Sequence, residues 1–235
     1  MRTLSHDRRT LAHIQAEIIH CTRCPRLTRY RKQVAGQKVR RYRDWEYWGR
    51  PIPSFGDPEA RLLILGLAPA AHGGNRTGRI FTGDRSGDWL YRALYTFGFA
   101  NQPSSVSRED GLELKDCYIT AALRCAPPQN KPTPQELTTC RPYLLAELRL
   151  LRRVRVVVAL GRIAFATFLR ACDETGLALP KPRPRFTHGA CFRLASGLTL
   201  LVSYHPSQQN TLTRRLTRPM FHATFREARR LLPPR

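Results

Sequence analysis

The chain contains 235 residues, of which 42% are hydrophobic and 9% aromatic, a composition that supports a folded core and excludes a largely disordered protein. Its 40 Lys and Arg residues exceed its 17 Asp and Glu residues by 23, so we expect a polyanionic partner, with nucleic acid favoured over an anionic membrane surface. No apolar run reaches the roughly 18 residues of a membrane span, and residues 1–16 lack the apolar core of a secretory signal. We therefore expect a cytoplasmic protein without a membrane partner.

The first half of the chain is predicted to alternate helices, strands and long loops. Apolar residues at helical spacing predict an amphipathic helix over 10–20. A basic and aromatic segment at 34–50 has no clear period and is predicted to be ordered but irregular. The next predicted elements are, in order, a loop at 51–58, a buried strand at 62–67, a Gly-rich loop up to Gly87, a helix from Asp88 that stops at Gly98, a strand at 117–121 and a Pro-rich loop at 124–134.

The second half continues the same alternation. Pro134 stands where a helix would start, and residues 136–151 keep helical spacing. The β-branched run at 154–160 is typical of a strand that is covered on both faces. The remaining predicted elements are a helix at 161–169, a Pro-rich connection at 179–184, a hairpin of 192–194 and 198–202, a loop at 205–218 and a final helix at 219–232.

This alternation of strands and helices indicates the α/β fold class, with a parallel sheet and helices on both of its faces. In such folds the functional site lies beyond the carboxyl ends of the strands. Three loops leave those ends, at 68–87, 124–134 and 205–218, and they contain most of the conspicuous Gly, Pro, Asn and His residues. No internal repeat is visible, and we expect residues 1–235 to form a single domain.

The first of these loops belongs to a Gly-rich segment that runs from Gly66 to Gly87 and leads into a helix N-terminus. Its glycines allow the backbone to approach a ligand closely, and helix N-termini favour anions. The segment is not a P-loop, because no Gly-Lys-Ser/Thr follows. Asp84 is one of few acids in a basic chain, which makes it a candidate site residue. The alternative is a turn in which Asp84 only caps the next helix.

The other two loops offer polar side chains of different kinds. Asn130 follows two prolines that stiffen the backbone, and its amide suits the edge of a nucleobase, although it could simply satisfy its own backbone. His205 could donate a hydrogen bond or a proton to a ligand at neutral pH, although an isolated His is more often structural. Side chains further along could hold phosphates: Ser207, Thr211, Thr213, Arg214 and Arg215.

Four of the seven cysteines are spaced as possible metal ligands. Cys21 and Cys24 form a C-x2-C pair, and Cys125 and Cys140 follow 100 residues later. In a cytoplasmic chain such cysteines are expected to be reduced or metal-bound. Four thiolates can hold zinc or an iron–sulfur cluster, and spacing alone does not choose between them. The other three lie in or beside apolar elements and are interpreted as ordinary free thiols.

Taken together, the motifs resemble those of a known enzyme family. The runs Gly-Leu-Ala-Pro-Ala, Gly-Arg-Ile-Phe-Thr-Gly-Asp and His-Pro-Ser-x-x-Asn, combined with the four spaced cysteines, look like a family 5 (type b) uracil-DNA glycosylase. The resemblance extends from Cys21 to the last predicted helix. The related family 4 enzymes carry an acid directly after the first glycine of the first motif, where this chain has Leu67. One departure is Arg214, since the family has a glycine before the Arg-Leu-Thr run.

The resemblance implies a three-layer α/β/α sandwich with a central four-stranded parallel sheet and an N-terminal cluster-binding segment. It also implies a [4Fe–4S] cluster in a redox-inert structural role, with Cys21, Cys24, Cys125 and Cys140 as ligands. The implied enzyme is monofunctional. It flips uracil, and other deaminated bases such as hypoxanthine, out of double- or single-stranded DNA and hydrolyses the N-glycosidic bond. The product is an abasic site for base excision repair, and the expected form is a monomer associated with the nucleoid.

Catalytic roles follow from the same resemblance. Asp84 would orient or activate the attacking water and offset the positive charge that develops on the sugar. Asn130 would contact the edge of the base. His205 would donate a hydrogen bond to the departing base and stabilise its negative charge.

Binding roles are assigned in the same way. Phe81 would stack on the flipped base, and Asn210 and Ala68 complete the implied base-binding set. Either Leu212 or Leu216 would wedge into the space left in the base stack. The residues expected to hold DNA phosphates are Ser207, Arg214 and Arg215.

Three other functions stay open at this point. A uracil-specific glycosylase closer to family 4 would not act on hypoxanthine. A non-catalytic iron–sulfur protein that binds nucleic acid would explain the charge and the cysteines, but it would not need Asp84, Asn130 and His205 around one pocket. An electron-transfer protein would explain only the cysteines, so it ranks last.

Overall fold

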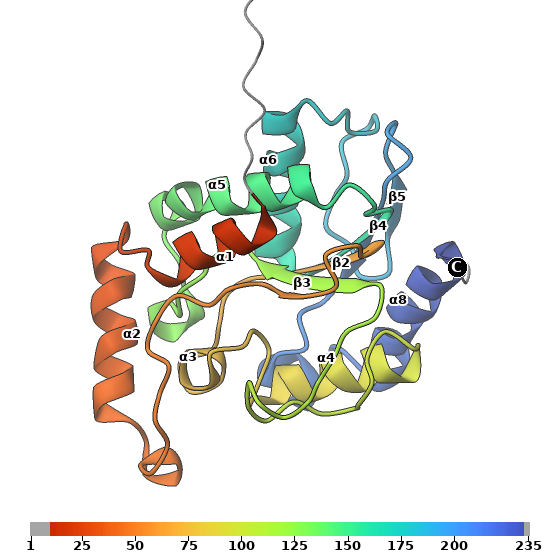
Figure 1. The fold of residues 1–235 in the computed structure, drawn as a ribbon. Helices are drawn as coiled ribbons and strands as arrows, with labels where there is room; N and C mark the ends of the chain where they lie inside the picture. The colour runs from red at the N-terminus through yellow and green to blue at the C-terminus, as the bar shows by residue number, and fades with distance from the viewer. Residues whose placement is uncertain (1–9, 233–235) are drawn as a thin grey trace, which may run out of the picture.

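The computed structural model of the protein describes residues 10–232. Its six strands form one sheet in the order β1-β3-β2-β4-β6-β5 (Figure 1). Two short antiparallel strands, β1 (Phe55–Gly56) and β5 (Cys191–Arg193), extend the sheet at its edges. The four inner strands are parallel, which confirms the predicted core of the fold: β2 (Leu62–Gly66), β3 (Cys117–Ala121), β4 (Val156–Leu160) and β6 (Thr199–Ser203).

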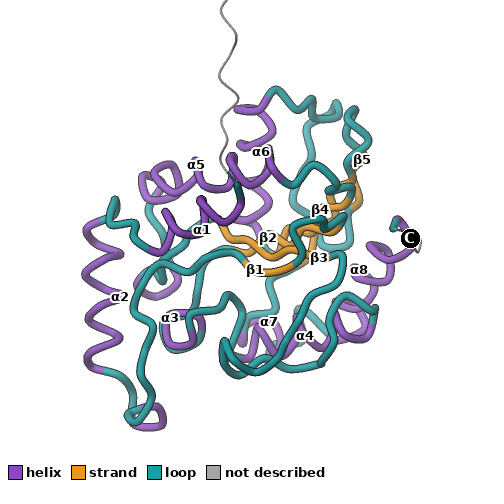
Figure 2. The backbone as a smooth tube through the Cα atoms, viewed as in Figure 1, coloured by secondary structure: helices purple, strands orange, loops and turns teal. Residues whose placement is uncertain are grey.

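Helices cover both faces of the sheet, as Figures 1 and 2 show. One face carries α5 (Pro134–Leu150) and α6 (Arg162–Thr175), with α1 (Leu11–Ile19) packed on α5. The other face carries α4 (Arg85–Thr96) and α8 (Arg218–Leu231). Among residues 10–232, no helix is long and apolar enough to span a membrane. The remaining helical segments are α2 (Pro25–Gln37), η1 (Arg40–Tyr42), α3 (Gly74–Thr77), η2 (Pro128–Asn130) and α7 (Gln208–Leu212).

Each inner strand contributes to two hydrophobic cores, because successive side chains of a strand point to opposite faces. In β2, Leu62 and Ile64 face the core beneath α4 and α8, whereas Leu63 and Leu65 face the core beneath α5 and α6. Every residue of the four inner strands is buried. Burial on both faces explains why these strands are mostly apolar in the sequence, with Thr120, Thr199 and Ser203 as buried polar exceptions.

Several elements differ from the expectations for the sequence. The helix predicted at 161–169 is longer, since α6 ends at Thr175, and the predicted loop at 205–218 contains α7. No helix was expected where α2 begins, because its basic composition hides an apolar face formed by Leu27 and Val34. The helix expected from Asp88 begins at Arg85, since the preceding residue caps it. The predicted loop at 51–58 contains the short strand β1, which pairs with β3.

Candidate active site

The three predicted loops meet beyond the carboxyl ends of the parallel strands. They follow β2, β3 and β6, and Figure 2 shows α3, α4 and α7, which lie in or after these loops, on the same side of the sheet. Together the loops line a cavity of about 560 Å³. Six of the nine residues predicted to bind the base or DNA or to catalyse the reaction lie in its lining: Ala68, Phe81, Asp84, Asn130, His205 and Ser207.

Asp84 lies at the N-terminus of α4. Its Oδ1 accepts a hydrogen bond from the backbone N–H of Gly87 at 2.9 Å, so the carboxylate caps the helix. Burial raises the pKa of Asp84, while the backbone N–H groups of Gly87 and Ser86 oppose the rise by favouring the charged form. A carboxylate with a raised pKa is a better proton acceptor, so capping the helix and reacting in the cavity are compatible roles.

Phe81 and His205 form a stacked pair in the cavity wall. Their ring centroids are 5.9 Å apart and their planes differ by 26°. Phe81 adopts a φ of 54°, in the left-handed region, and a Cβ on Gly66 would stand only 2.8 Å from its ring. Burial lowers the pKa of His205 to about 4. The imidazole is therefore neutral at pH 7, with one ring nitrogen able to donate and the other to accept.

Asn130 presents its side chain at the mouth of the cavity. Gln129 and Asn130 have φ values of 53° and 58°, so two consecutive residues of η2 are left-handed. The backbone N–H of Asn130 donates to the carbonyl oxygen of Pro127 at 3.1 Å. Its side-chain amide is exposed and makes no hydrogen bond within residues 10–232. The amide is therefore available to a ligand, and it does not serve its own backbone.

Asn210 acts on the third loop from outside the cavity lining. Its Nδ2 donates to the carbonyl oxygen of His205 at 2.8 Å. Its backbone N–H donates to Oγ of Ser207 at 3.3 Å, so that the hydroxyl caps α7. Asn210 thus fixes the backbone that carries the histidine, while Ser207 contributes to the cavity itself.

The residues after α7 are mostly exposed. Arg214 has a φ of 57°, and the guanidinium carbon of Arg215 lies 4.8 Å from the centre of the Tyr204 ring. Of the two leucines considered as a wedge, Leu212 is 63% exposed and Leu216 is fully buried in the core beneath α4 and α8. The prediction for Leu216 is therefore wrong, because a core residue cannot enter a base stack. Leu212 stays the candidate.

Sequence reasoning missed several side chains of the cavity. Gln129 directly precedes the predicted asparagine, and a glutamine pair follows the predicted serine. These residues could have been predicted, because they are neighbours of predicted site residues in the same loops. Arg85 places an exposed cation next to Asp84, at the start of a helix that was expected to begin three residues later. The missed lining residues are Ala70, Arg85, Ser86, Gln129, Gln208 and Gln209.

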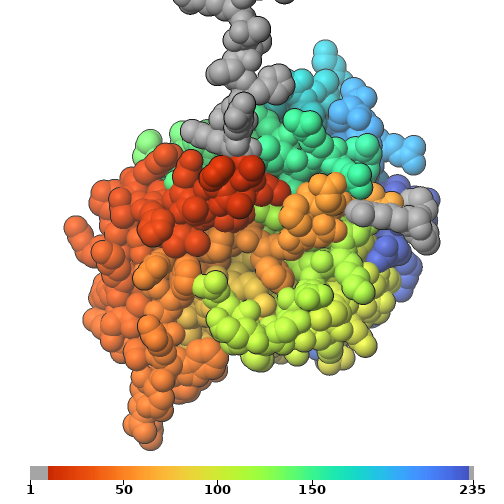
Figure 3. Space-filling view, viewed as in Figure 1, coloured from red at the N-terminus to blue at the C-terminus, as the bar shows by residue number. Residues whose placement is uncertain are grey.

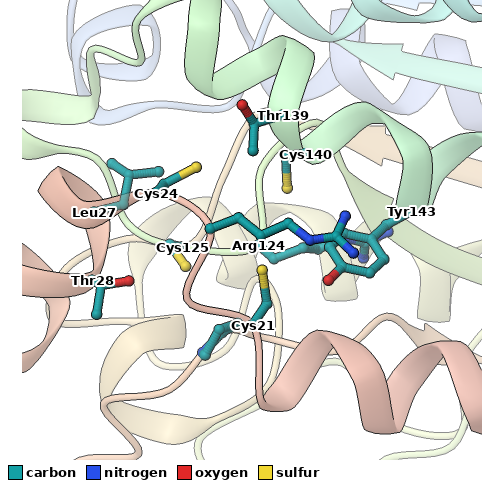
Figure 4. Close-up of a pocket in the computed structure, with 11 residues that line it drawn as sticks. Cys21, Cys24, Leu27, Thr28, Arg124, Cys125, Thr139, Cys140 and Tyr143 are labelled. Carbon is teal, nitrogen blue, oxygen red and sulfur yellow. The ribbon is translucent and has the colours of Figure 1, made fainter.

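A second cavity brings the four predicted cysteine ligands together (Figure 4). Cys21 and Cys24 lie in the connection between α1 and α2, Cys125 in the loop after β3, and Cys140 in α5. All four are free thiols. Segments that are about a hundred residues apart in the sequence are thus joined at one cysteine-lined point.

The lining of this cysteine cavity combines cations with the four thiols. It contains Arg23 and Arg124 and no carboxylate, and Nε of Arg124 is buried without a hydrogen-bond partner among the described residues. Burial raises the pKa of Cys125 to about 12 and that of Cys140 to about 11. Within residues 10–232, no three His, Cys, Asp or Glu side chains form a group that could hold a metal ion. Four thiols are the type of donor that an iron–sulfur cluster takes once they are deprotonated, but their placement does not by itself define a metal site.

Comparison with known proteins identifies the family. Residues 53–229 match the model of the uracil DNA glycosylase superfamily. The chain is 53% identical over 211 residues to a type-5 uracil-DNA glycosylase of Thermus thermophilus, which covers 90% of this chain and 93% of the relative. It is 52% identical over 223 residues to a type-5 uracil-DNA glycosylase of Mycobacterium tuberculosis, which covers 94% and 82%. A type-4 uracil-DNA glycosylase of Thermotoga maritima is 30% identical over 153 residues, which cover 65% and 67%. The chain therefore belongs to the uracil-DNA glycosylase superfamily and, within it, to the type-5 group.

Proposed function

We propose that this chain removes uracil from DNA by hydrolysing the N-glycosidic bond, which leaves an abasic site for base excision repair. The observation that carries the proposal is that Asp84, Asn130 and His205, from three loops far apart in the sequence, line one cavity. The similarity to type-5 uracil-DNA glycosylases supports the reaction. The net charge of +23 supports a DNA substrate, because neutralised phosphates provide much of the affinity for DNA.

Recognition begins with a base that leaves the helix. A uracil inside a duplex is inaccessible, so it must be flipped into the cavity, and a mispaired uracil is flipped at lower cost. The ring of Phe81 offers an apolar surface in the cavity wall, and stacking on an aromatic ring contributes roughly 1–3 kcal/mol per base. The exposed amide of Asn130 has both a donor and an acceptor for the polar edge of the base.

Cleavage requires charge stabilisation on both sides of the breaking bond. When the C1′–N1 bond breaks, its electron pair stays on the uracil and positive charge develops on the sugar. A neutral His205 can donate a ring N–H to a uracil oxygen and stabilise the departing anion. The Asp84 carboxylate offsets the charge on the sugar and orients a water, whose oxygen bonds to C1′ and whose proton it accepts. The proton then passes to the uracil anion, and the sugar keeps the hydroxyl.

The cavity is also proposed to accept other deaminated bases, such as hypoxanthine. Leu67 lines the cavity at the position where the family 4 motif carries an acid. An apolar side chain rejects alternative bases less strongly than a hydrogen-bonding group, because it leaves no buried polar atom unpaired.

The four cavity cysteines are proposed to hold a [4Fe–4S] cluster: Cys21, Cys24, Cys125 and Cys140. Such a cluster would supply a structural cross-link between the segment that joins α1 to α2 and the segment from β3 to α5. The reaction is a hydrolysis and transfers no electrons, so the proposed role is redox-inert.

A single chain is proposed to be sufficient for activity on DNA in the nucleoid. Asp84, Asn130 and His205 all come from the same chain and line one cavity, so a monomer already contains the proposed catalytic groups. The oligomeric state can be checked by sedimentation of the protein with and without a uracil-containing duplex.

The decisive experiment is single-turnover cleavage of two duplexes, one with uracil opposite guanine and one with hypoxanthine opposite thymine. Alkaline treatment reveals the abasic sites. We expect excision of both bases. Cleavage of uracil alone would favour the narrower, type-4-like specificity. Absence of cleavage by protein that contains iron and still binds DNA would contradict the enzymatic proposal and favour a non-catalytic DNA-binding protein.

A further inference from the structure

The basic and aromatic segment before β1 has no part in the reaction described above, yet it is tied to the first loop of the active site. The backbone N–H of Trp48 donates to the carbonyl oxygen of Arg76 in α3 at 2.9 Å. The hydroxyl of Tyr47 lies 3.1 Å from Nδ1 of His72, just before α3. The turn η1 and the residues that follow it form the orange lobe at the lower edge of Figure 3. This lobe is therefore joined to the loop that carries Asp84.

Arg76 is the centre of this junction. Its side chain is 3% exposed. Its guanidinium carbon lies 3.9 Å from the ring centre of Tyr42 and 4.1 Å from that of Trp45. The two rings meet edge to face at 74°, and together they form a corner that we call the aromatic corner. Attraction between a cation and two ring faces restricts where the guanidinium can lie.

Backbone carbonyl groups of the active-site loop fix the same guanidinium. Its Nε donates to the carbonyl oxygen of His72 at 2.9 Å, and its Nη2 donates to that of Gly83 at 3.1 Å. Gly83 has a φ of 75°, and a Cβ there would collide with the guanidinium, so the close approach requires glycine. Gly83 directly precedes Asp84. Arg76 therefore holds the peptide unit from which the proposed catalytic carboxylate extends.

The charge of Arg76 is not neutralised by an acid of its own. Among the described residues it forms no ion pair, and its Nη1 is buried without a hydrogen-bond partner. The charged and titratable groups around Asp84 are Arg76, Arg85, Asp88, Tyr91 and His205. Burial raises the pKa of Asp84, Asp88 adds to the rise, and Arg76 opposes it. Arg85 is exposed and screened by solvent, and His205 is neutral at pH 7.

We propose that Arg76 is a positioning residue: held by the aromatic corner, it fixes the peptide before Asp84 and so orients the Asp84 carboxylate. Its effect on catalysis rests on the function proposed above, whereas its effect on the carboxylate is a property of the free protein. The role of the aromatic corner is to restrict the movement of Arg76 and, through Arg76, of the loop that carries Asp84.

The test combines two measurements on the full chain. One is the pH dependence of single-turnover uracil excision, and the other is the pKa of Asp84 from carbon-13 NMR of the aspartate carboxyl groups, assigned with Asp84→Asn. Arg76→Met removes the charge and both hydrogen bonds. We expect the acidic limb of the rate profile and the pKa of Asp84 to rise, because a nearby positive charge is lost. The rate at neutral pH should fall about 10- to 100-fold, because the carboxylate is less well oriented. Arg76→Lys keeps the charge, so it should slow excision while leaving the acidic limb close to its wild-type position.

Trp45→Leu provides a variant that should fold normally, because Trp45 is 38% exposed. It removes half of the aromatic corner, and we expect shifts in the same direction as for Arg76→Met but smaller. The matched control is Tyr95→Leu. Tyr95 is an aromatic residue that is 49% exposed at the opposite end of the helix that Asp84 caps. This control should leave both the rate profile and the pKa of Asp84 unchanged.

The outcomes separate a positioning role from a purely structural one. A lower melting temperature with an unmoved acidic limb and an unmoved Asp84 pKa in Arg76→Met and Trp45→Leu would overturn the inference. If Arg76→Met does not fold, the comparison of Trp45→Leu with Tyr95→Leu decides between a positioning role and a purely structural one. A wild-type protein that excises no base would overturn the proposed function instead. In that case the NMR titration would still establish or refute the effect of Arg76 on Asp84.

Discussion

The active-site cavity and the cysteine cavity differ in the backbone conformation of the residues that line them. The active-site cavity is formed by loops, and several residues of its lining have left-handed backbone conformations: Phe81, Gln129 and Asn130. The cysteine cavity also has loop residues in its lining, from the α1–α2 connection and the loop after β3, but none of its lining residues is left-handed, and it lies next to a buried ion pair. Nη2 of Arg124 and Oε2 of Glu147 are 2.5 Å apart there, with side chains that are 2% and 0% exposed.

This difference predicts that substitutions in the two cavities affect different properties of the protein, the reaction rate in one and the stability in the other. A non-glycine residue in the left-handed region costs roughly 1–2 kcal/mol, and such strain persists where a side chain must be aimed at a ligand. Removing one partner of a buried ion pair destabilises a protein by about 3–5 kcal/mol. Substitutions in the active-site cavity should therefore alter the reaction more than the fold, and substitutions at the cysteine cavity should do the reverse.

The largest effect is expected from Asp84→Asn in the active-site cavity. The amide oxygen can still cap α4, so the fold should be kept, but the charge and the proton acceptor are lost. Single-turnover excision of uracil should fall about 10²- to 10⁴-fold, with DNA affinity little changed. The control is Asp173→Asn, at an exposed position in α6 on the opposite face of the sheet. A near-normal rate in Asp84→Asn would remove the role assigned to this carboxylate.

The second largest effect is expected from Cys125→Ser in the cysteine cavity, and it should concern stability. If the thiols hold a cluster, the variant should lose bound iron and its visible absorption. The melting temperature should fall by about 10 °C, because the N-terminal helices lose their cross-link. Cys191→Ser is the control, since this thiol is exposed and lies outside the cavity. Iron analysis and thermal unfolding measure the effect, and an iron-free wild-type protein purified without oxygen would contradict it.

The inner sheet and the positions of the three loops could be predicted from the sequence for physical reasons. Strands that are buried on both faces are mostly apolar, and β3 occupies the predicted bounds, Cys117–Ala121. Parallel strands place their following loops at one edge, which is why Asp84, Asn130 and His205 could be expected together.

Other features could not be predicted, because they depend on contacts distant in the sequence. Leu216 looked available as a wedge, since only the packing of α4 and α8 shows that it belongs to the core. The aromatic corner lacks any period, because Tyr42 and Trp45 pack around one guanidinium more than thirty residues away and not along a helix or strand. No local pattern in the chain indicates such a partner.

A third, smaller effect tests whether the active-site histidine is neutral. His205 has a pKa of about 4 in the folded protein against 6.5 when exposed. Between these values the unfolded chain binds a proton that the folded chain does not, so the free energy of unfolding rises with pH across this window. The full shift corresponds to about 3 kcal/mol, and partial exposure of the ring reduces the expected effect to about 1–3 kcal/mol.

His205→Asn removes this proton-binding difference. From pH 7 to pH 4.5 the wild type should therefore lose more stability than the variant, by about 1–3 kcal/mol. Urea unfolding at the two pH values measures the difference, and the carboxyl groups common to both proteins cancel. An equal loss in the two proteins would mean that His205 titrates normally, and the cavity would then lack its neutral donor at mildly acidic pH.

The smallest effect concerns Arg214, which is left-handed like Phe81 but lies outside the cavity lining. Glycine would relieve its strain, but it would also add freedom to the unfolded chain, so Arg214→Gly should change stability by less than about 1 kcal/mol. If the guanidinium contacts a phosphate, the slope of log affinity against log salt should become shallower by about 0.9. Arg214→Gln should give the same slope change without relieving the strain, and Arg193→Gln, on the edge strand β5, should give none. An unchanged slope in both Arg214 variants would show that left-handed strain also occurs where no ligand is bound, and the link between strain and reactivity would then hold only within the cavity.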